Sequence, residues 1–380
     1  MRRHGWMLLL PTLLLGGCTA FVTRQITRPG HHLPDGEFRE LLTAQGLQRE
    51  SLRTVEGLRI AYWLVPPRAY RVRGKVERTV RDGRVVGGAF KFRIGADAPA
   101  RLPPLPAKGS VLLLHPWGMS GVAMLPWALK YAQAGYVAVV PDLRSQGSSG
   151  DAPIGYGPRE AADMVDLARQ LRSTGHLPGP LYLVGASYGA TVALYVAPGL
   201  PQLRGVLALE PYANAAATIR RAPASGLFGH RWLARWITPR EVDAAIARAS
   251  RQLGVDLALI DAGDAVAASA VCTLVLRGSD DRLITAAALH AISARSPRAR
   301  YVEVPGENHL SLPISLDRLF QPSLEWMRAL ADGAADTCPA FSVQPRPGAT
   351  ASPAAGIPAS APAPTAIPAP AAGAPATAGR

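Results

Sequence analysis

The sequence has little cysteine, little lysine and no long apolar run. Cysteine occurs 3 times in 380 residues, and lysine only at positions 75, 91, 108 and 130, so arginine supplies most of the formal charge of +14. The basic residues are dispersed, without a run of five or more, and no nucleic-acid recognition motif accompanies them. Dispersed positive charge favours solubility and loose attraction to anionic surfaces. We therefore predict no nucleic-acid partner.

Motifs that hold metals or phosphates are also missing. No H-x-x-x-H or paired-cysteine spacing occurs, and His31 and His32 form an isolated pair. The glycine-rich stretch at residues 185–189 lacks the lysine that a phosphate-binding loop requires. The sequence therefore implies no metal site and no cofactor.

The first 17 residues are predicted to be a secretory signal peptide. A basic pair precedes an apolar stretch, Trp6 to Leu15, that is too short to span a bilayer. It ends in Leu-Gly-Gly-Cys, which resembles the lipobox of bacterial lipoproteins and implies that Cys18 is diacylated through its sulfur. Thr19, in place of Asp, favours by the same resemblance the outer membrane facing the periplasm. The alternative is ordinary cleavage near small residues, with Cys18 incidental.

Two cysteines remain, and their state is left open. In an oxidising periplasm Cys272 and Cys338 could pair. Cys272 also sits in an apolar run, where a cysteine can act as a small buried hydrophobe.

Residues 18–45 are interpreted as a tether followed by a first helix, Phe38 to Ala44. The main domain is then expected over residues 46–338, beginning with a strand from Leu58 to Val65. A hairpin is predicted from Val72–Arg78 and Ala89–Ile94 around the turn at residues 82–83.

After a Pro-rich link, short continuous apolar runs alternate with helical stretches. This pattern is typical of a mostly parallel sheet with helices on both faces, so an α/β fold is predicted. The expected strands are 111–114, 137–140, 181–184, 205–209, 271–276 and 301–304, and the expected helices are 123–133, 158–172 and 187–196.

An insertion of about 213–269 interrupts this alternation. It carries Leu227, Phe228, Trp232 and Trp236 and then an amphipathic helix, Pro239 to Gln252. We favour a helical lid, with a second packing layer as the alternative. Residues 339–380 are rich in Ala and Pro and are predicted to form a disordered tail, because they offer little to bury.

A nucleophile motif stands between a predicted strand and a predicted helix. Residues 185–189 read Gly-Ala-Ser-Tyr-Gly, the G-x-S-x-G pattern in which small flanking residues allow a tight strand-to-helix turn. Such a turn holds the hydroxyl of Ser187 outward near a helix N-terminus. The alternative is a glycine-rich turn without chemistry.

With this motif the chain resembles the α/β-hydrolase family over roughly residues 50–330. The family places an acid and then a histidine after the nucleophile. Gly278-Ser279-Asp280-Asp281-Arg282-Leu283-Ile284 resembles the acid turn and selects Asp281, with Asp280 and Glu210 as alternatives. Gly306-Glu307-Asn308-His309 resembles the histidine segment. The resemblance implies an α/β-hydrolase fold and a Ser187, His309 and Asp281 triad.

Two backbone amides are expected to form an oxyanion hole. One belongs to Tyr188, directly after the nucleophile. The other, by resemblance, falls in His115-Pro116-Trp117-Gly118-Met119, where Pro116 has no N–H to donate. This departure from the family pattern favours the amide of Trp117 over that of Met119, with His115 in a structural role.

The sequence thus predicts a serine hydrolase that transfers an acyl group to water. A carboxylic ester with a hydrophobic acyl or alkyl group is the favoured small-molecule or lipid-like substrate, because alcohol leaving groups need less assistance than amines. A peptidase or thioesterase would use the same groups. The alternative from another class is a non-catalytic envelope lipoprotein that retains the fold.

Overall fold

The computed structural model describes residues 19–31, 40, 42–43, 47–70, 72–81, 84–94, 102–225, 237–333 and 338–346. The chain divides by its contacts into Met1–Gln344 and Pro345–Arg380. The elements below belong to the first unit, and only residues 345 and 346 of the second are described. The predicted signal peptide, Cys18 and most of the predicted tail lie outside the described residues.

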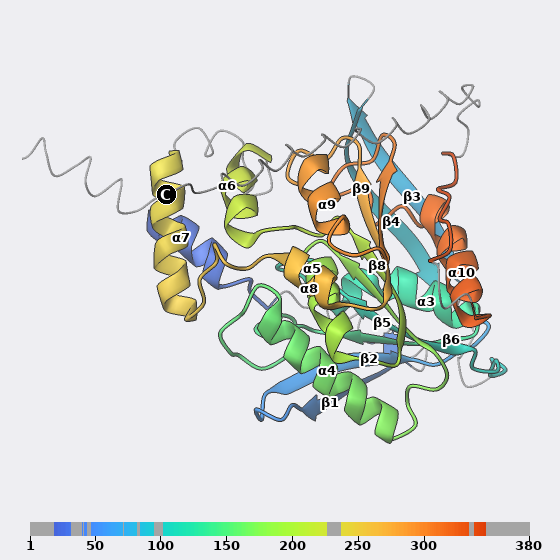
Figure 1. Ribbon diagram of the computed structural model, residues 1–380. Coiled ribbons are helices and arrows are strands. Elements are labelled where there is room, and N and C mark those ends of the chain that lie inside the picture. The colour runs from blue at the N-terminus through green and yellow to red at the C-terminus, as the bar shows by residue number, and fades with distance from the viewer. Residues whose placement is uncertain are drawn as a thin grey trace, which may run out of the picture. The chain divides into compact units, whose positions relative to one another are not determined.

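An eight-stranded sheet forms the centre of this unit (Figure 1). Its order is β1-β2-β6-β5-β7-β8-β9-β10, in which β1 pairs with β2 and β2 with β6 antiparallel, and all later pairs are parallel. The strands are β1 Gln48–Arg53, β2 Arg59–Val65, β5 Gly109–Leu114, β6 Tyr136–Pro141, β7 Leu181–Ala186, β8 Leu203–Leu209, β9 Cys272–Gly278 and β10 Ala299–Val304.

The central strands are buried along their whole length. Every residue of β5, β6, β7 and β9 is buried, which explains why their sequences are mostly apolar and do not alternate. Ser110, Thr273 and Arg277 are the buried polar exceptions in these strands. Helices cover both faces, and two apolar cores result. The α/β-hydrolase fold predicted from the sequence is therefore confirmed.

The helices divide between these two cores. Helices α4, α5 and α9 bury side chains in the first core, whereas α3 and α10 bury theirs in the second. Their bounds are α3 Leu125–Gln133, α4 Pro158–Ser173, α5 Tyr188–Val196, α9 Ala286–Ser293 and α10 Leu316–Ala331. The sequence patterns predicted α3, α4 and α5 within two residues at each end.

The insertion after β8 consists, in its described parts, of α6 Ala215–Ser225, α7 Pro239–Leu253 and α8 Ala262–Ala268. Helix α7 begins with a capping box, in which Thr238 and Glu241 bind each other's backbone amides. Its apolar face joins the first core, with Val242, Ile246 and Leu253 buried. The insertion therefore forms a packing layer at least in part. Residues 226–236, which include the four large apolar side chains of the predicted lid, lie outside the described residues.

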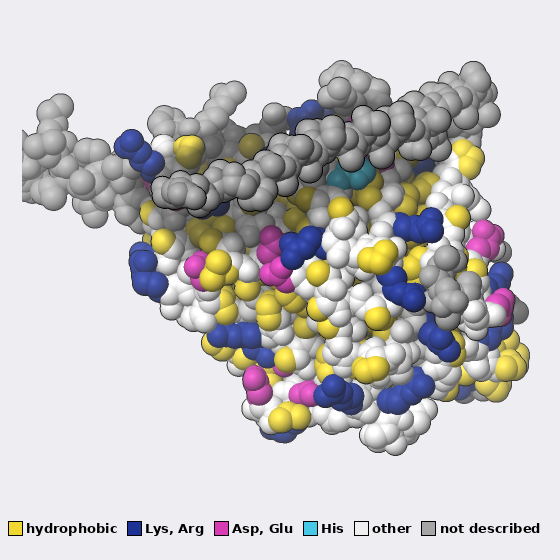
Figure 2. Space-filling model, viewed as in Figure 1, with side chains coloured by type: hydrophobic (Ala, Val, Ile, Leu, Met, Phe, Trp, Pro, Cys, Tyr) yellow, Lys and Arg dark blue, Asp and Glu magenta, His cyan; other side chains and the backbone are white. Residues whose placement is uncertain are grey.

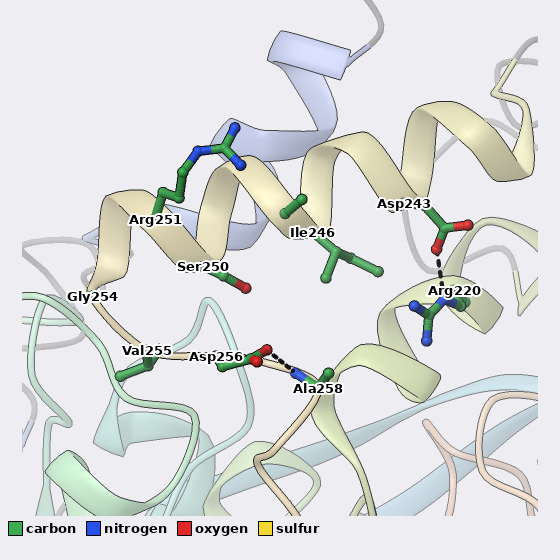
Figure 3. A pocket seen from close by; sticks show the side chains of 10 residues that line it. Arg220, Asp243, Ile246, Ser250, Arg251, Gly254, Val255, Asp256 and Ala258 are labelled. Atoms are coloured by element: carbon green, nitrogen blue, oxygen red, sulfur yellow. Dashed lines mark hydrogen bonds and ion pairs between the residues drawn. The ribbon is translucent and has the colours of Figure 1, made fainter.

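The segment predicted as a tether is folded near its start. Residues 19–27 are helical, and Val22 and Ile26, four positions apart, are 3% and 2% exposed in the first core. Figures 1 and 3 both draw this helix alongside α7. The amphipathic spacing was present in the sequence, but two apolar contacts among the nine helical residues that are described are too few to signal a docked element. Of the predicted first helix, only positions 40, 42 and 43 are described, and all three are helical.

Strands β3 Val72–Arg81 and β4 Arg84–Ile94 pair antiparallel in a separate two-stranded sheet, as the hairpin pattern predicted. The turn at residues 82–83 lies outside the described residues.

A disulfide joins Cys272, on β9, to Cys338. The residues after Cys338 stay on the domain: Phe341 and Val343 pack against the second core, and the amide of Gln344 donates to the carbonyl of Arg318 at 3.2 Å. The predicted tail boundary at residue 339 therefore differs from the structure, where 338–344 are ordered by the disulfide and these contacts. No helix in the described part of the chain has both the length and the apolar character needed to span a membrane.

Candidate active site

Ser187 occupies a strained position between β7 and α5. Its φ is 51° and its ψ is −113°, a backbone conformation that non-glycine residues rarely adopt. The amide of Ser187 donates to the carbonyl of Leu209 on β8 at 2.7 Å, and its own carbonyl accepts from Ala190 and Thr191. The turn is thus fixed from both sides.

The two glycines of the motif permit close backbone contacts. A Cβ on Gly185 would lie 2.3 Å from the carbonyl oxygen of Gly189, and a Cβ on Gly189 would lie 2.3 Å from that of Leu114. Both distances are far inside van der Waals contact with backbone that cannot easily move. Helix α5 can therefore approach β5 and β7 only with glycine at both positions, as the G-x-S-x-G pattern predicts.

The structure brings the three predicted triad side chains together. Ser187 Oγ lies 2.8 Å from His309 Nε2, and His309 Nδ1 lies 2.9 Å from Asp281 Oδ2. This geometry requires the tautomer in which Nδ1 donates to Asp281 and Nε2 accepts from the serine hydroxyl. His309 is bonded to neither alternative acid, Asp280 or Glu210.

Asp281 is held as a charged acceptor. It is 6% exposed, and its Oδ1 accepts from the amides of Leu283 at 2.6 Å and Ile284 at 3.0 Å. Burial by itself raises the pKa of Asp281, but the hydrogen bond and charge attraction of His309, with the backbone amide, bring that pKa below its ordinary value. The carboxylate is therefore ionised where it faces His309.

The loop of Asp281 (the acid loop, residues 278–284) and the loop of His309 (the histidine loop, residues 306–309) are bonded directly to each other. The amide of Asp280 donates to the carbonyl of Glu307 at 2.9 Å, and that of Gly306 donates to Ser279 Oγ at 2.8 Å. A Cβ on Gly278 would lie 2.3 Å from the carbonyl of Glu307, so this contact requires glycine. These bonds fix the distance between Asp281 and His309.

The hairpin β3–β4 supports the histidine loop, which the sequence did not indicate. Arg78 of β3 donates to Glu307 at 3.2 Å and to Asp317 at 2.9 Å. On β4, the carbonyl of Val85 accepts from the side chain of Asn308. Glu307 is fully buried, yet its pKa stays below the ordinary value, because bonds from Ser311, Arg318 and Arg78 outweigh burial. A lone Arg on a predicted strand carries no signal of this contact.

The amides predicted for the oxyanion hole are free of protein acceptors. No acceptor within the described residues binds the amide of Trp117 or of Tyr188. In the same loop, Gly118 donates to Gln146 Oε1 at 2.8 Å and Met119 to the carbonyl of Pro116 at 3.4 Å. Among the amides of Trp117, Gly118 and Met119, that of Trp117 is therefore the one without a protein acceptor in the described residues.

His115 is fully buried and makes two bonds to backbone. Its Nδ1 lies 2.8 Å from the carbonyl of Pro116, and its Nε2 accepts from the amide of Leu143 at 3.0 Å. Burial lowers the pKa of His115 and keeps the ring neutral. It joins the loop after β5 to the loop after β6, the structural role expected for it.

A cluster of aromatic rings lies against this loop. Trp117 stacks on Tyr156 with ring centroids 5.2 Å apart and meets the edge of Tyr188 at 5.0 Å. The hydroxyl of Tyr212 donates to the carbonyl of Tyr156, and that of Tyr156 donates to the carbonyl of Ile26 in the N-terminal helix, at 2.8 Å. The N-terminal helix thus contacts Tyr156, which in turn stacks on Trp117 of the loop that bears the oxyanion candidate.

A separate cavity of about 580 Å³ lies between α6, α7 and residues 254–258 (Figure 3). An ion pair between Arg220 and Asp243, both about half exposed, spans one end of it. None of the three triad residues lines this cavity. On the face that Figure 2 shows, Lys and Arg side chains are scattered among apolar ones and form no continuous stripe.

One cluster in the described residues has the ligand types and spacing of a metal site. It consists of Glu210, Asp281 and His309, each with one ligand atom within 4.8 Å of the others. Asp281 and His309 already bind each other, and His309 also binds Ser187. The ligand atoms of Asp281 and His309 are therefore occupied by hydrogen bonds within the protein.

The sequence matches the Alpha/beta hydrolase family over residues 111–321, more than half of its length. The chain therefore belongs to the Alpha/beta hydrolase family. Among solved structures it is similar to an esterase of Pyrococcus furiosus, with a TM-score of 0.53 and 15% identity over 80% of this chain and 96% of that one. It is also similar to the alpha/beta hydrolase GrgF of Penicillium sp. sh18, with a TM-score of 0.51 and 14% identity over 75% of this chain and 98% of that one. At these identities the likeness shows the fold alone. No curated protein matches the sequence.

Proposed function

We propose that this chain is a serine carboxylic-ester hydrolase whose nucleophile is Ser187. The observation that carries the proposal is the pair of bonds, 2.8 Å and 2.9 Å, that links Ser187, His309 and Asp281 at the strained turn after β7. A nucleophile within reach of a base, with an acid orienting that base, is the arrangement that activates a hydroxyl.

The reaction proceeds in two acyl transfers. His309 Nε2 takes the proton of Ser187 as Oγ attacks the ester carbonyl, and then gives that proton to the departing alcohol. Asp281 stabilises the imidazolium that forms. Water then attacks the acyl-serine with His309 again as the base, which releases the acid and restores Ser187.

The amides of Trp117 and Tyr188 are proposed to bind the oxyanion of both tetrahedral intermediates. Each is free of protein acceptors in the described structure, and Tyr188 opens α5, where the helix dipole adds positive potential. Losing one such donor costs about 3 kcal/mol of transition-state stabilisation in serine hydrolases.

A hydrophobic acyl or alkyl group is proposed for the substrate. The partly exposed ring of Trp117 is held by packing on the buried rings of Tyr156 and Tyr188 and offers an apolar surface beside the proposed oxyanion hole. The sequence of the insertion adds four large apolar residues, at positions 227, 228, 232 and 236, which lie outside the described residues.

We further propose that Cys18 is lipidated and holds the protein at the outer membrane, facing the periplasm. The lipobox resemblance supports this, as does the disulfide between Cys272 and Cys338, since disulfides persist in oxidising compartments. Metabolic labelling with an alkyne analogue of palmitate tests it. Label on the wild type but not on Cys18→Ser supports the anchor, and label on neither excludes it.

The activity is tested with fluorophosphonate and a graded series of p-nitrophenyl acyl esters, using the full chain in detergent beside Ser187→Ala. We expect labelling and turnover in the wild type, with both lost in the variant. Labelling without ester turnover would favour a peptidase or thioesterase. A folded wild type that shows neither would favour the non-catalytic lipoprotein.

A further inference from the structure

Glu210 is a second buried carboxyl behind the triad. It follows β8 directly, with a φ of 57° and its amide bonded to the carbonyl of Leu276 on β9 at 2.8 Å. The side chain is fully buried. Its conformation, which non-glycine residues rarely adopt, turns it toward β9 and the acid loop.

The two carboxylate oxygens of Glu210 have different surroundings. Oε1 accepts from the amide of Gly278 at 2.6 Å. No donor among the described residues reaches Oε2, although an oxygen of Glu210 lies within 4.8 Å of both Asp281 and His309. A buried carboxylate oxygen without a donor is costly, whereas a protonated one can itself donate to a neighbouring carboxylate.

We propose that Glu210 is a positioning residue of the triad: it keeps its proton, donates it to Asp281 in a hydrogen bond, and so holds the Asp281 carboxylate against His309. This inference rests on the proposed function for its catalytic consequence. Asp281 then accepts from four groups, namely the amides of Leu283 and Ile284, His309 and Glu210. It could not turn away from His309 without breaking several of these bonds.

The charges around Glu210 agree with this assignment. Burial and the charge of Asp281 raise the pKa of Glu210 well above its ordinary value. Among the described residues, the charge of Arg277 opposes that rise. Its guanidinium is bonded to the backbone carbonyls of Ile284 and Asp281, each at 2.8 Å, and to Glu303 at 2.9 Å. Two carboxyls this close share a single negative charge, and Asp281 retains it because His309 and two amides favour its ionised form.

The test compares Glu210→Gln and Glu210→Leu in the full chain. Glutamine keeps a donor for Asp281 and an acceptor for the amide of Gly278, so we expect kcat and KM close to those of the wild type. Leucine fills the space without donating, so we expect kcat to fall about tenfold to a hundredfold with KM unchanged. Loss of kcat in the glutamine variant, or full activity in the leucine variant, would overturn the inference.

Two readouts report the proton directly and need no turnover. Infrared spectra should show a protonated carboxyl in the wild type that Glu210→Gln removes. Because the folded-state pKa of Glu210 is raised, its contribution to stability is fully present below its unfolded pKa and is lost as pH rises. The Tm of the wild type should therefore fall, relative to that of Glu210→Gln, as the pH is raised from 5 to 8.

The pH dependence of kcat/KM shows what an ionised Glu210 would do instead. If Glu210 were ionised, Glu210→Gln would remove a negative charge beside His309, and the acidic limb of kcat/KM would move to lower pH. Such a move, or no protonated carboxyl in the infrared spectrum, would overturn the inference. If the wild type hydrolysed no substrate, the proposed function would fail, while the infrared and Tm measurements would still decide the state of Glu210.

Discussion

Arg78 reaches from the β3–β4 hairpin to Glu307, two residues before His309, and donates to its carboxylate at 3.2 Å. The hairpin lies outside the main sheet, so this ion pair connects the base of the proposed reaction to an element far away in sequence. Arg318 binds the same carboxylate at 2.9 Å from α10. The histidine loop is thus held between two arginines.

Replacing Arg78 with alanine should impair both stability and activity. The change leaves Glu307 with one arginine in a fully buried position, which we expect to cost about 2–3 kcal/mol in the free energy of unfolding. Urea unfolding and kcat measure the two effects. Lys91→Ala is the matched control, because it breaks the exposed pair with Glu77 on the same hairpin. Equal effects of both variants would contradict the role of Arg78.

Glu307 should make stability depend on pH in the acid range. Its folded-state pKa is depressed, so the stability it contributes is present above its unfolded pKa, about 4.3, and is lost as pH falls through the folded value. We expect Glu307→Gln to be destabilised relative to the wild type at pH 7, and the difference to shrink below pH 4. Thermal melts over this range measure it. A difference that stayed constant with pH would contradict the expectation.

Asp281→Asn should reduce kcat by roughly 10³- to 10⁴-fold, because an amide cannot stabilise the imidazolium and favours the wrong tautomer of His309. Asp280→Asn is its neighbour control and should keep most of the activity, since Asp280 contacts the histidine loop through its backbone amide. Ester hydrolysis decides between the two positions. A larger loss at Asp280 would move the acid to that residue.

Ile26→Asp should release the N-terminal helix from the domain. The variant places a charge at a position that is 2% exposed, and release of the helix would break the hydrogen bond from Tyr156 to the carbonyl of residue 26, so we expect lower kcat/KM. Trypsin should also cut faster after Arg24, whereas Arg28 precedes Pro29 and is not a trypsin site. Phe21→Asp, on the same helix but 46% exposed, should change neither rate. Unchanged proteolysis in Ile26→Asp would argue against docking.

Removing the disulfide should lower stability by about 2–4 kcal/mol, because the bond closes a long loop in the unfolded chain. Cys272→Ser with Cys338→Ser tests this by urea unfolding. A reducing agent should destabilise the wild type and leave the double variant unaffected, which makes the double variant its own control. Identical responses would indicate that the bond does not form in solution.

The fold, and the three residues Ser187, Asp281 and His309 that the structure brings together, could be named from the sequence because each depends on a local pattern. Buried parallel strands are mostly apolar along their whole length. The tight G-x-S-x-G turn leaves no room for a side chain at positions 185 and 189, so glycine at both is a direct sign of it. The supporting contacts were not predictable. Arg78 and Ile26 contact partners distant in sequence, and only the folded chain shows which groups they meet. Glu210 was named from the sequence only as an alternative acid, and the folded chain shows that it lies beside Asp281.

The docking of residues 19–27 also changes how far the domain could move. A free chain of 27 residues, the predicted tether and first helix without Cys18, could extend roughly 90 Å. With residues 19–27 helical and held to the domain by the buried side chains of Val22 and Ile26, almost none of that reach would remain between Cys18 and the domain. If Cys18 is acylated as proposed, the protein would sample a thin layer along the bilayer and would keep one orientation toward it. Esters in that layer would meet the enzyme by lateral diffusion, and those deeper in the periplasm would have to come to the membrane.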